Sequence, residues 1–310
     1  MRILVTGAAG FLGSHFSEKA LLSGHQVLGI DDFSTGSREN IALLTKFPNF
    51  TFQEHDIRSP IEVNPDRIVN FACPASPIHY QADPIRTIET TFLGTHNLLK
   101  LALKTSAHML QASTSEVYGD PIHSPQVETY WGNVNPIGIR ACYDEGKRAA
   151  ETLCFDYRRM HDLDIRVMRI FNTYGPRMAE HDGRVVSNFI VSALRGNDIT
   201  IYGDGTQTRS FCYVSDLVAG AYKMLFLSEN IDSPINLGND HEFSVSDLAS
   251  LVIQLTSSES KIVFLDLPQD DPRMRKPDLS RARGILGYEP NIHLFDGIQR
   301  TIEYFRETLK

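Results

Sequence analysis

The chain begins with a short apolar run that leads directly into a glycine-rich loop. Arg2 to Thr6 predicts a buried strand, and the apolar-periodic run that ends at Leu22 predicts a helix. Between them lies Gly7-Ala8-Ala9-Gly10-Phe11-Leu12-Gly13. Glycines at this spacing let the backbone approach a pyrophosphate, while the helix N-terminus supplies amide donors and the positive end of its dipole. The unit predicts a dinucleotide site, with an ordinary strand-turn-helix connection as the alternative.

An acidic pair follows the second predicted strand. That strand, Gln26 to Ile30, ends in Asp31-Asp32, at about the distance along the chain expected for the acid that binds an adenosine ribose. A carboxylate there would repel a 2′-phosphate, so Asp31 favours NAD over NADP. Asp56, after the third predicted strand, is expected either to touch the adenine or to cap a turn.

Strands and helical runs alternate through the first half of the chain. Asn49 to Gln53, Arg67 to Ala72 and His108 to Ala112 predict further strands, and Asp83 to Lys104 predicts a long helical run. This alternation predicts an α/β fold with a parallel, doubly wound sheet. Ligands bind beyond the carboxyl ends of such strands, where we expect 55–57, 73–80 and 113–119 to surround one crevice.

One helix carries a tyrosine and a lysine four residues apart. Tyr143 and Lys147 lie in the predicted helix Ala141 to His161, so both side chains share one face. A free phenol titrates near pH ~10, but a nearby ammonium favours the phenolate. Tyr143 is therefore a candidate general base. The alternative is an exposed pair on a solvated helix.

The second half of the chain is less regular and predicts a smaller lobe. We expect residues 1–170 to form the dinucleotide-binding domain, with return segments at about 211–238, which hold the predicted helix Ser215 to Leu227 and strand Pro234 to Leu237. Residues 171–210 and 239–310 would form the interleaved lobe that binds substrate.

Composition narrows the classes of partner. A net charge of −8 argues against nucleic acid and anionic membranes. The four cysteines show no metal-ligand spacing, so no metal is expected. The first residues leave no room for a signal peptide and no apolar run is long enough to span a bilayer, which together predict a cytoplasmic protein.

Taken in order, the segment Thr6 to Gly13, Asp31, Thr114 and the Tyr143/Lys147 pair resemble the extended short-chain dehydrogenase/reductase family of nucleotide-sugar enzymes. The resemblance covers essentially the whole chain. It is strongest to the UDP-glucuronic acid decarboxylases of that family, through residues 113–121, 130–138, 142–148, 169–178 and 182–189.

The resemblance implies a Rossmann fold, bound NAD and a UDP-sugar substrate. UDP-glucuronic acid would be oxidised at C4, lose carbon dioxide from the 4-keto acid and be reduced to UDP-xylose, with no net redox change. It also implies a homodimer built from the 83–104 and 141–161 helices of two subunits.

The resemblance further implies roles for individual residues. Tyr143 would take the proton of the sugar 4-hydroxyl, Thr114 would hydrogen-bond that oxygen, and Lys147 would hold Tyr143 and the cofactor ribose. Ser115 stands where related 4,6-dehydratases carry an aspartic acid. Glu116 would carry a proton or position a water, with Arg209 as its matching cation, although a surface-loop charge is the alternative for Arg209.

Two further sets of residues match binding positions of the family. The cofactor set is Gly7, Gly10, Phe11, Leu12, Gly13, Asp31, Asp32, Asp56, Ile57, Ala72, Tyr143 and Lys147. The substrate set is Tyr80, Asn172, Arg177, Arg184, Asn188, Tyr202, Gln207, Arg209 and Arg275. The chain departs from the family pattern at Cys73, where a small or hydroxyl residue is usual, and at Asp32, where Asn is common.

Three alternatives to the decarboxylase remain open from the sequence. The same scaffold serves 4-epimerases and 4,6-dehydratases, and Ser115 argues against the dehydratase. The third alternative is a catalytically silent NAD-binding scaffold, against which the intact Thr114, Tyr143 and Lys147 argue.

Overall fold

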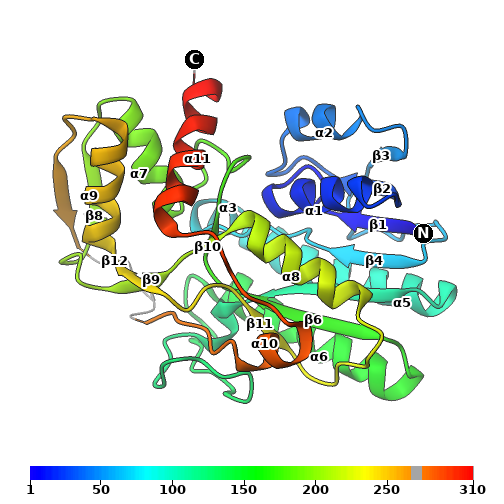
Figure 1. Cartoon of the computed structure of the whole chain (residues 1–310). Helices are drawn as coiled ribbons and strands as arrows, with labels where there is room; N and C mark the ends of the chain where they lie inside the picture. Colours follow the sequence, from blue (N-terminus) through cyan, green and yellow to red (C-terminus); the bar gives the residue numbers. More distant parts are fainter. Residues whose placement is uncertain (267–273, 310) are drawn as a thin grey trace.

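A parallel sheet of seven strands forms the centre of the molecule (Figure 1). The computed structural model describes residues 1–266 and 274–309. The strands are ordered β11-β6-β5-β4-β1-β2-β3, and every neighbouring pair is parallel. Their bounds are β1 Arg2–Thr6, β2 Gln26–Asp31, β3 Phe50–Glu54, β4 Arg67–Asn70, β5 His108–Thr114, β6 Ile165–Ile170 and β11 Ile235–Leu237. The predicted doubly wound α/β fold is confirmed.

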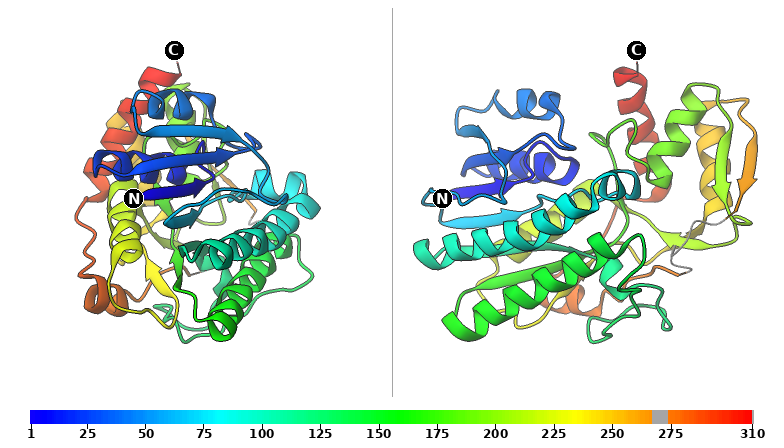
Figure 2. Two further views of the ribbon diagram at one scale, coloured as in Figure 1. Left: turned by 90° about the vertical axis from the view of Figure 1, so that its right-hand side faces the viewer. Right: turned by 180° about the vertical axis from the view of Figure 1, so that it is seen from behind.

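Helices cover both faces of this sheet, which is why its strands are apolar throughout. In β1, Ile3 and Val5 pack with α1 (Phe11–Leu22) and α8 (Val214–Phe226), whereas Leu4 packs on the other face with α5 (Thr95–Thr105) and α6 (Ala141–His161). Consecutive strand residues point to opposite faces, so each layer receives alternate side chains. Figure 2 shows α5 and α6 side by side from behind.

The predicted long helical run after Asp83 contains an unpredicted wider turn. The segment consists of α4 (Pro84–Glu89), a π-helical turn (Thr90–Gly94) and α5, and it follows the short α3 (Pro77–Ala82). The Asp83 side chain caps α4 by accepting a hydrogen bond from the Arg86 amide. At Gly94 an added Cβ would collide with Ile57, so a glycine lets this turn lie against the loop after β3.

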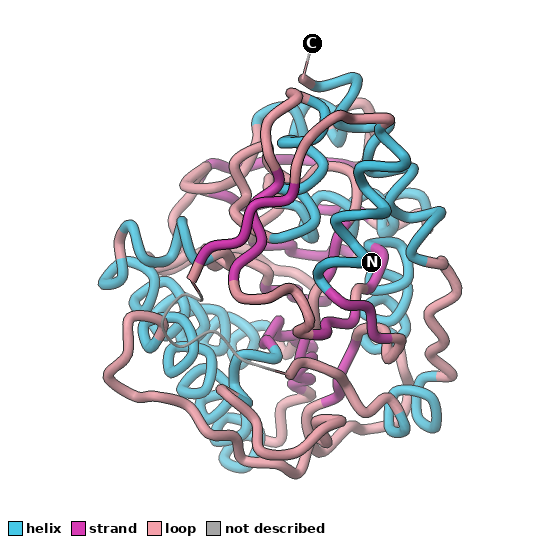
Figure 3. The backbone as a smooth tube through the Cα atoms, turned by 90° about the vertical axis from the view of Figure 1, so that its left-hand side faces the viewer, coloured by secondary structure: helices cyan, strands magenta, loops and turns pink. Residues whose placement is uncertain are grey.

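Most of the remaining elements gather on one side of the sheet, which Figure 3 views directly, whereas α2 packs against α1 and α10 packs against β11 and α8. Three two-stranded ribbons pair β7 with β10, β9 with β12 and β8 with β13. Helix α7 packs against α9 and α11. The bounds are α2 Arg38–Leu44, η2 Ser115–Tyr118, β7 Thr173–Tyr174, α7 Val185–Leu194, β8 Ile199–Tyr202, β9 Thr208–Ser210, β10 Cys212–Tyr213, β12 Glu242–Ser244, α9 Val245–Thr256, β13 Ile262–Leu265, α10 Ser280–Leu286 and α11 Leu294–Thr308.

Strand ends bring the chemistry to one edge of the sheet. Strand β5 is two residues longer than predicted and ends at Thr114, while β4 ends at Asn70, two residues earlier than predicted. The Asn70 side chain accepts a hydrogen bond from the Ala72 amide and turns the chain out of the sheet. Within the described residues, no helix is both long and apolar enough to cross a membrane.

Candidate active site

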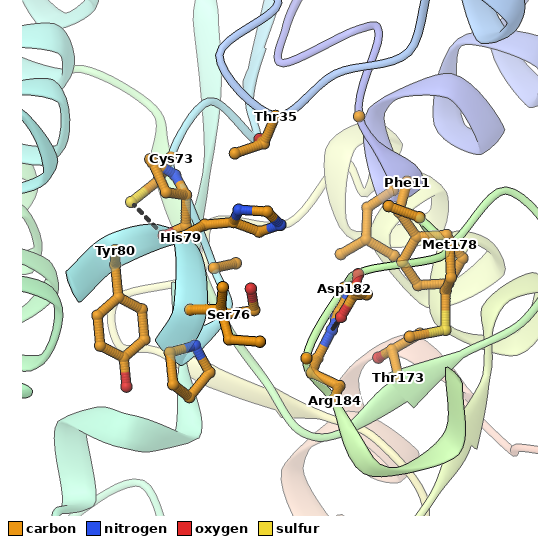
Figure 4. A pocket seen from close by; sticks show the side chains of 18 of the residues that line it. Phe11, Thr35, Cys73, Ser76, His79, Tyr80, Thr173, Met178, Asp182 and Arg184 are labelled. Atoms are coloured by element: carbon orange, nitrogen blue, oxygen red, sulfur yellow. Dashed lines mark hydrogen bonds and ion pairs between the residues drawn. The ribbon is translucent and has the colours of Figure 1, made fainter. Parts of the chain in front are cut away.

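A single large cavity runs along the carboxyl ends of the strands. Its volume is about 1110 Å³, and it extends from the glycine loop to the elements of the second half of the chain. Every site residue predicted from the sequence lines this cavity except Asp56. Figure 4 shows Cys73, His79 and Tyr80 along one part of the wall, with Phe11, Met178 and Arg184 across from them. Ser76 and His79 line it within the predicted segment 73–80, whereas Thr35, Thr173 and Met178 line it and were not predicted.

The loop between β1 and α1 forms a cradle that only glycine permits. Gly7 has a positive φ of 72°, which favours glycine. A Cβ on Gly13 would collide with the Gly7 carbonyl oxygen. The loop therefore closes on itself and presents the N-terminus of α1 to the cavity, as an anion-binding cradle requires.

Asp31 lies beside this cradle at the end of β2. Its carboxylate accepts hydrogen bonds from the Ala9 amide at 3.0 Å and the Phe33 amide at 2.8 Å, so it also braces the loop. Burial raises the pKa of Asp31, and these amide hydrogen bonds oppose the rise. The arrangement fits the predicted ribose-binding acid.

Asp56 does not line the cavity, because two arginines engage its carboxylate. Arg58 bonds it at 2.7 Å and Arg86 lies 3.7 Å away, while the Arg58 amide donates to Asp56 Oδ1. These contacts favour the alternative role of Asp56 in a turn, and its contact with adenine stays a prediction. Arg86 also pairs with Asp32 at 2.8 Å, so the departure from Asn at that position creates an ion pair.

Helix α6 places Tyr143 and Lys147 on its buried face, as the spacing predicts. The Tyr143 ring stacks on Tyr80, with centroids 5.0 Å apart and planes 5° from parallel. Lys147 Nζ donates a hydrogen bond to the Ala112 carbonyl at 2.9 Å and lies 5.7 Å from the Tyr143 ring centroid. The stack and the hydrogen bond hold both side chains against the end of β5.

The protein alone does not lower the pKa of Tyr143. Burial raises it well above its ordinary value, Cys73 adds to the rise, and a side-chain hydrogen bond with Thr114 opposes it. The Lys147 ammonium is directed to the Ala112 carbonyl, and the expectation that it favours the phenolate stays a prediction.

Glu116 lies between two arginines on the floor of the site. It follows Thr114 and Ser115 in the short helix η2, and its amide donates to Thr114 Oγ1 at 3.2 Å. Arg140 bonds the Glu116 carboxylate at 2.9 Å, and Arg275 contacts its two oxygens at 2.7 and 2.8 Å. Such buried carboxylates are stabilised only when they are paired.

The two guanidiniums decide the protonation state of Glu116. Burial alone would raise its pKa, but Arg275 and then Arg140 outweigh that effect, and the pKa lies below its usual value. The side chain is an anion at neutral pH. Because an anion has no proton to donate, Glu116 is better suited to position a water than to act as a proton carrier.

Arg209 lowers the pKa of Glu116 through its charge, as a matching cation would, and its role stays a prediction. Arg275, predicted as a substrate ligand, contacts the carboxylate directly. A backbone bridge joins Arg209 to Arg275, so both guanidiniums belong to the same wall. Arg140 was missed, although its position one turn before Tyr143 was a usable signal.

The remaining predicted substrate residues form the outer wall. Arg184 pairs with Asp182 and lies 5.5 Å from the Phe11 ring centroid, and Arg177 pairs with Glu18 of α1 at 2.7 Å. Each arginine thus already has an acidic partner. The other members line the cavity: Tyr80, Asn172, Asn188, Tyr202 and Gln207. Among the described residues, no group of three or more His, Cys, Asp or Glu side chains could hold a metal ion.

Comparison with known proteins gives one family. Residues 3–238 match the model of the NAD dependent epimerase/dehydratase family. UDP-glucuronic acid decarboxylase 1 of Xenopus tropicalis is 50% identical over 309 residues, covering 100% of this chain and 73% of that protein. UDP-glucuronic acid decarboxylase 3 of Arabidopsis thaliana is 51% identical over 307 residues, covering 99% and 89%.

Solved structures share the fold at lower identity. UDP-glucose 4-epimerase of Thermotoga maritima, solved with UDP-glucose, superposes with a TM-score of 0.90 at 28% identity and covers 100% of both chains. UDP-glucuronic acid 4-epimerase of Bacillus cereus, solved with UDP-glucuronic acid and NAD, gives a TM-score of 0.88 at 29% identity, with 99% and 100% coverage.

Proposed function

Because the chain belongs to the NAD dependent epimerase/dehydratase family and, within it, to the UDP-glucuronic acid decarboxylases, we propose that it converts UDP-glucuronic acid into UDP-xylose and carbon dioxide. The observation that carries this proposal is the identity of about one residue in two with curated decarboxylases along the whole chain. The predicted catalytic side chains meet in one cavity, which supports the same reaction.

The residues present fit NAD. The glycine cradle and the N-terminus of α1 suit a pyrophosphate, and Asp31 suits a ribose with a free 2′-hydroxyl. When bound, NAD takes up the hydrogen of C4 with its two electrons, returns both to the product, and supplies a positive charge that favours a phenolate.

Tyr143 and Thr114 serve the oxidation of C4. We assign Tyr143 as the base that accepts the proton of the sugar 4-hydroxyl, and Thr114 as the hydroxyl that positions the same oxygen. Lys147 is held at the end of β5 by the Ala112 carbonyl, from where it keeps α6 and the cofactor ribose in register.

Loss of carbon dioxide then follows from the chemistry of the 4-keto acid. The carboxylate is β to the ketone, so the C5–C6 bond can break with its electron pair moving onto the C4 oxygen beside Tyr143 and Thr114. Glu116, held as an anion, positions the water that protonates C5. Arg275 and Arg209 supply positive charge to this wall.

The outer wall holds the nucleotide. We assign Asn172, Asn188, Arg184 and Gln207 to the diphosphate and sugar, and the exposed ring of Tyr202 to stacking on the uracil. Arg177 would bind through the guanidinium nitrogen that Glu18 does not engage.

A 4-epimerase is the second candidate, because the Bacillus cereus relative was solved with the same sugar acid. The dehydratase is disfavoured, since the Ser115 hydroxyl cannot replace a carboxylic acid as proton donor.

We also propose that two copies associate through α4, the π turn, α5 and α6. Six large apolar side chains on these elements are exposed: Ile85, Ile88, Phe92, Leu93, Leu103 and Met160. Contiguous exposed apolar side chains on a monomer mark an interaction surface. The cytoplasmic location and the division into lobes at 170, 210 and 238 remain predictions.

Mass spectrometry tests the proposed reaction. The purified protein is incubated with UDP-glucuronic acid and NAD, and the molecular mass of the sugar nucleotide is measured. Loss of one carbon dioxide supports decarboxylation. An isomer of unchanged mass would identify an epimerase, and unchanged substrate would favour a silent scaffold.

A further inference from the structure

Helix α6 presents four ionisable groups along the face that meets the cavity. Arg140 is the N-cap residue of α6, and Tyr143, Asp144 and Lys147 follow it at spacings of three, one and three residues, which places the four on one side of the start of the helix. All four are buried. The proposed reaction uses Tyr143 and Lys147, and leaves Arg140 and Asp144 without a role.

The Arg140 guanidinium pairs with a carboxylate of η2 and not with a carboxylate of α6. Its Nη2 donates to Glu116 Oε2 at 2.9 Å, and the side chains of both partners are about nine-tenths buried. An arginine and an aspartate four residues apart in a helix normally pair with each other. Here no ion pair joins Arg140 to Asp144 within the described part of the chain, and Arg140 bonds Glu116.

Asp144 is a buried carboxyl group with little to neutralise it. Only 7% of the residue is exposed, and its Oδ1 has no hydrogen-bond partner among the described residues. The groups that act on it are Glu116 of η2, Arg140 and Glu145 of α6, and Arg275; Asp144 in turn acts on Tyr80 of α3 and Cys142 of α6. Burial and then the Glu116 carboxylate raise the pKa of Asp144 to about 8.

We propose that Arg140 is a positioning residue that fixes the Glu116 carboxylate, and that Asp144, one turn further along α6, competes for Arg140 whenever it is ionised. The proposal rests on the proposed function, because it concerns the step for which Glu116 is used. It adds two residues that act through Glu116 rather than on the sugar.

The competition has a defined direction. While Asp144 is protonated, Arg140 stays with Glu116, which remains an oriented anion. Once Asp144 loses its proton, a second anion faces the same guanidinium and repels Glu116. The site should therefore work below the pH at which Asp144 ionises and lose its alignment above it.

Arg140→Gln tests the positioning role. It should lower kcat by roughly 10- to 100-fold with little change in KM, because Glu116 acts after the substrate has bound. Removing one of its cations should also raise the pKa of Glu116, so the acid limb of kcat moves up by about one pH unit. Arg140→Lys keeps the positive charge, so its kcat and the pH of its acid limb should lie between those of the parent protein and Arg140→Gln. A change in KM alone, or an unmoved acid limb, would overturn the role.

Asp144→Asn tests the competitor. The variant resembles the protonated side chain, so the alkaline limb expected near pH 8 should move to higher pH. Asp156→Asn is the matched control, because Asp156 is a half-exposed carboxylate of α6 that pairs with Arg159 and does not act on Asp144; its alkaline limb should stay in place. If Asp144→Asn keeps the same limb, Asp144 does not compete for Arg140.

A double-mutant cycle separates this inference from the proposed reaction. Urea unfolding of Arg140→Gln, Glu116→Gln and the double variant needs no substrate, and the shifts in midpoint should be clearly non-additive. Additive shifts would overturn the pairing, whatever the enzyme makes. If the unaltered protein releases no carbon dioxide, the proposed function is wrong. The pairing of Arg140 with Glu116 would still be tested by the unfolding cycle.

Discussion

Tyr143 is placed by packing and activated by charge, and these two requirements conflict. Stacking on Tyr80 and burial against β5 fix the phenol, but the same burial raises its pKa. Within the described residues, no cation contacts the phenol oxygen, since Lys147 is bonded to Ala112. Bound NAD would add a positive charge near Tyr143, which would favour the phenolate over the phenol.

Tyr143→Phe should remove the base and keep the scaffold. We expect at least a ~10²-fold fall in kcat, with thermal unfolding and NAD binding nearly unchanged. Tyr157→Phe is the control, because Tyr157 lies on the same helix in a half-buried position away from the cavity. The measurement is carbon dioxide release at saturating UDP-glucuronic acid. Activity within a few-fold of normal would exclude Tyr143 as the base.

Sequence patterns recover residues whose spacing is local. Tyr143 and Lys147 share a helix face, and Thr114 follows directly from the end of a strand. The pairing of Glu116 with Arg275 joins positions 159 residues apart, so no local pattern contains it. Only the tertiary packing decides that Arg275 rather than Arg209 reaches the carboxylate.

The loop between β1 and α1 depends on glycines that leave no room for a side chain. Gly13→Ala should destabilise the protein by about 1–3 kcal/mol and weaken NAD binding, because its Cβ would collide with the Gly7 carbonyl. Gly284→Ala is the matched control: Gly284 lies exposed in α10 with open space around it, so alanine should be neutral or stabilising. Thermal unfolding and NAD titration measure both effects. If Gly13→Ala and Gly284→Ala had the same unfolding temperature and the same affinity for NAD, the closed conformation of the β1–α1 loop would be contradicted.

Helix α1 is also tied to the start of the second half of the chain. His15 Nε2 lies 2.9 Å from the Pro176 carbonyl oxygen, and burial lowers the pKa of His15 to about 4. In the unfolded chain the imidazole titrates near pH ~6.5. Between about pH 4 and 6.5 the unfolded state therefore binds more protons than the folded state. The free energy of unfolding falls as the pH drops from about 6.5 towards 4.

His15→Gln should flatten this part of the stability profile. The loss attributable to His15 is on the order of 3 kcal/mol at the acid end, and it should be absent from the variant. Urea unfolding at several pH values between 4 and 7 measures it. A variant with the same slope as the parent protein would show that His15 does not titrate as described.

Regular elements are the part of the fold that the sequence predicts well. Strand β1 and helix α6 have the predicted bounds, because a continuous apolar run decides the strand and a helical apolar periodicity decides the helix. The π turn at Thr90–Gly94 and the paired strands β9 and β12 were not predicted. Both depend on partners distant in the chain, such as Ile57 for Gly94, and leave no periodic signal.

At the scale of the whole molecule, two groups of elements enclose the cavity. The second half of the chain does not stay apart, because β11 joins the central sheet beside β6 and α8 packs on α1. The segment at 211–238 therefore links the dinucleotide cradle to the outer wall. This geometry supports the division into lobes that we propose.

Association through α4, the π turn, α5 and α6 gives a whole-molecule prediction. Phe92→Glu should shift the protein from dimer to monomer at micromolar concentration, because it places a charge in an apolar interface. Leu22→Glu is the control, since Leu22 is 70% exposed on α1, away from these helices. Sedimentation velocity measures both. A parent protein that sediments as a monomer would contradict the proposed assembly.

The central claim is that oxidation at C4 and loss of carbon dioxide are separate steps served by separate residues. We propose that Tyr143, Thr114 and Lys147 serve the first step and that Glu116, which pairs with Arg275 and Arg140, serves the second. A variant of Glu116 should therefore stop the reaction between the two steps.

Single-turnover kinetics of Glu116→Gln test this most directly, with NADH absorbance and carbon dioxide release followed together. The account predicts that NADH forms at nearly the normal rate and accumulates with the 4-keto acid, while carbon dioxide release slows by at least ~10²-fold. Raising the concentration of UDP-glucuronic acid should not restore the release. If NADH formation and carbon dioxide release instead slow in step, Glu116 does not belong to the decarboxylation step and the account is wrong.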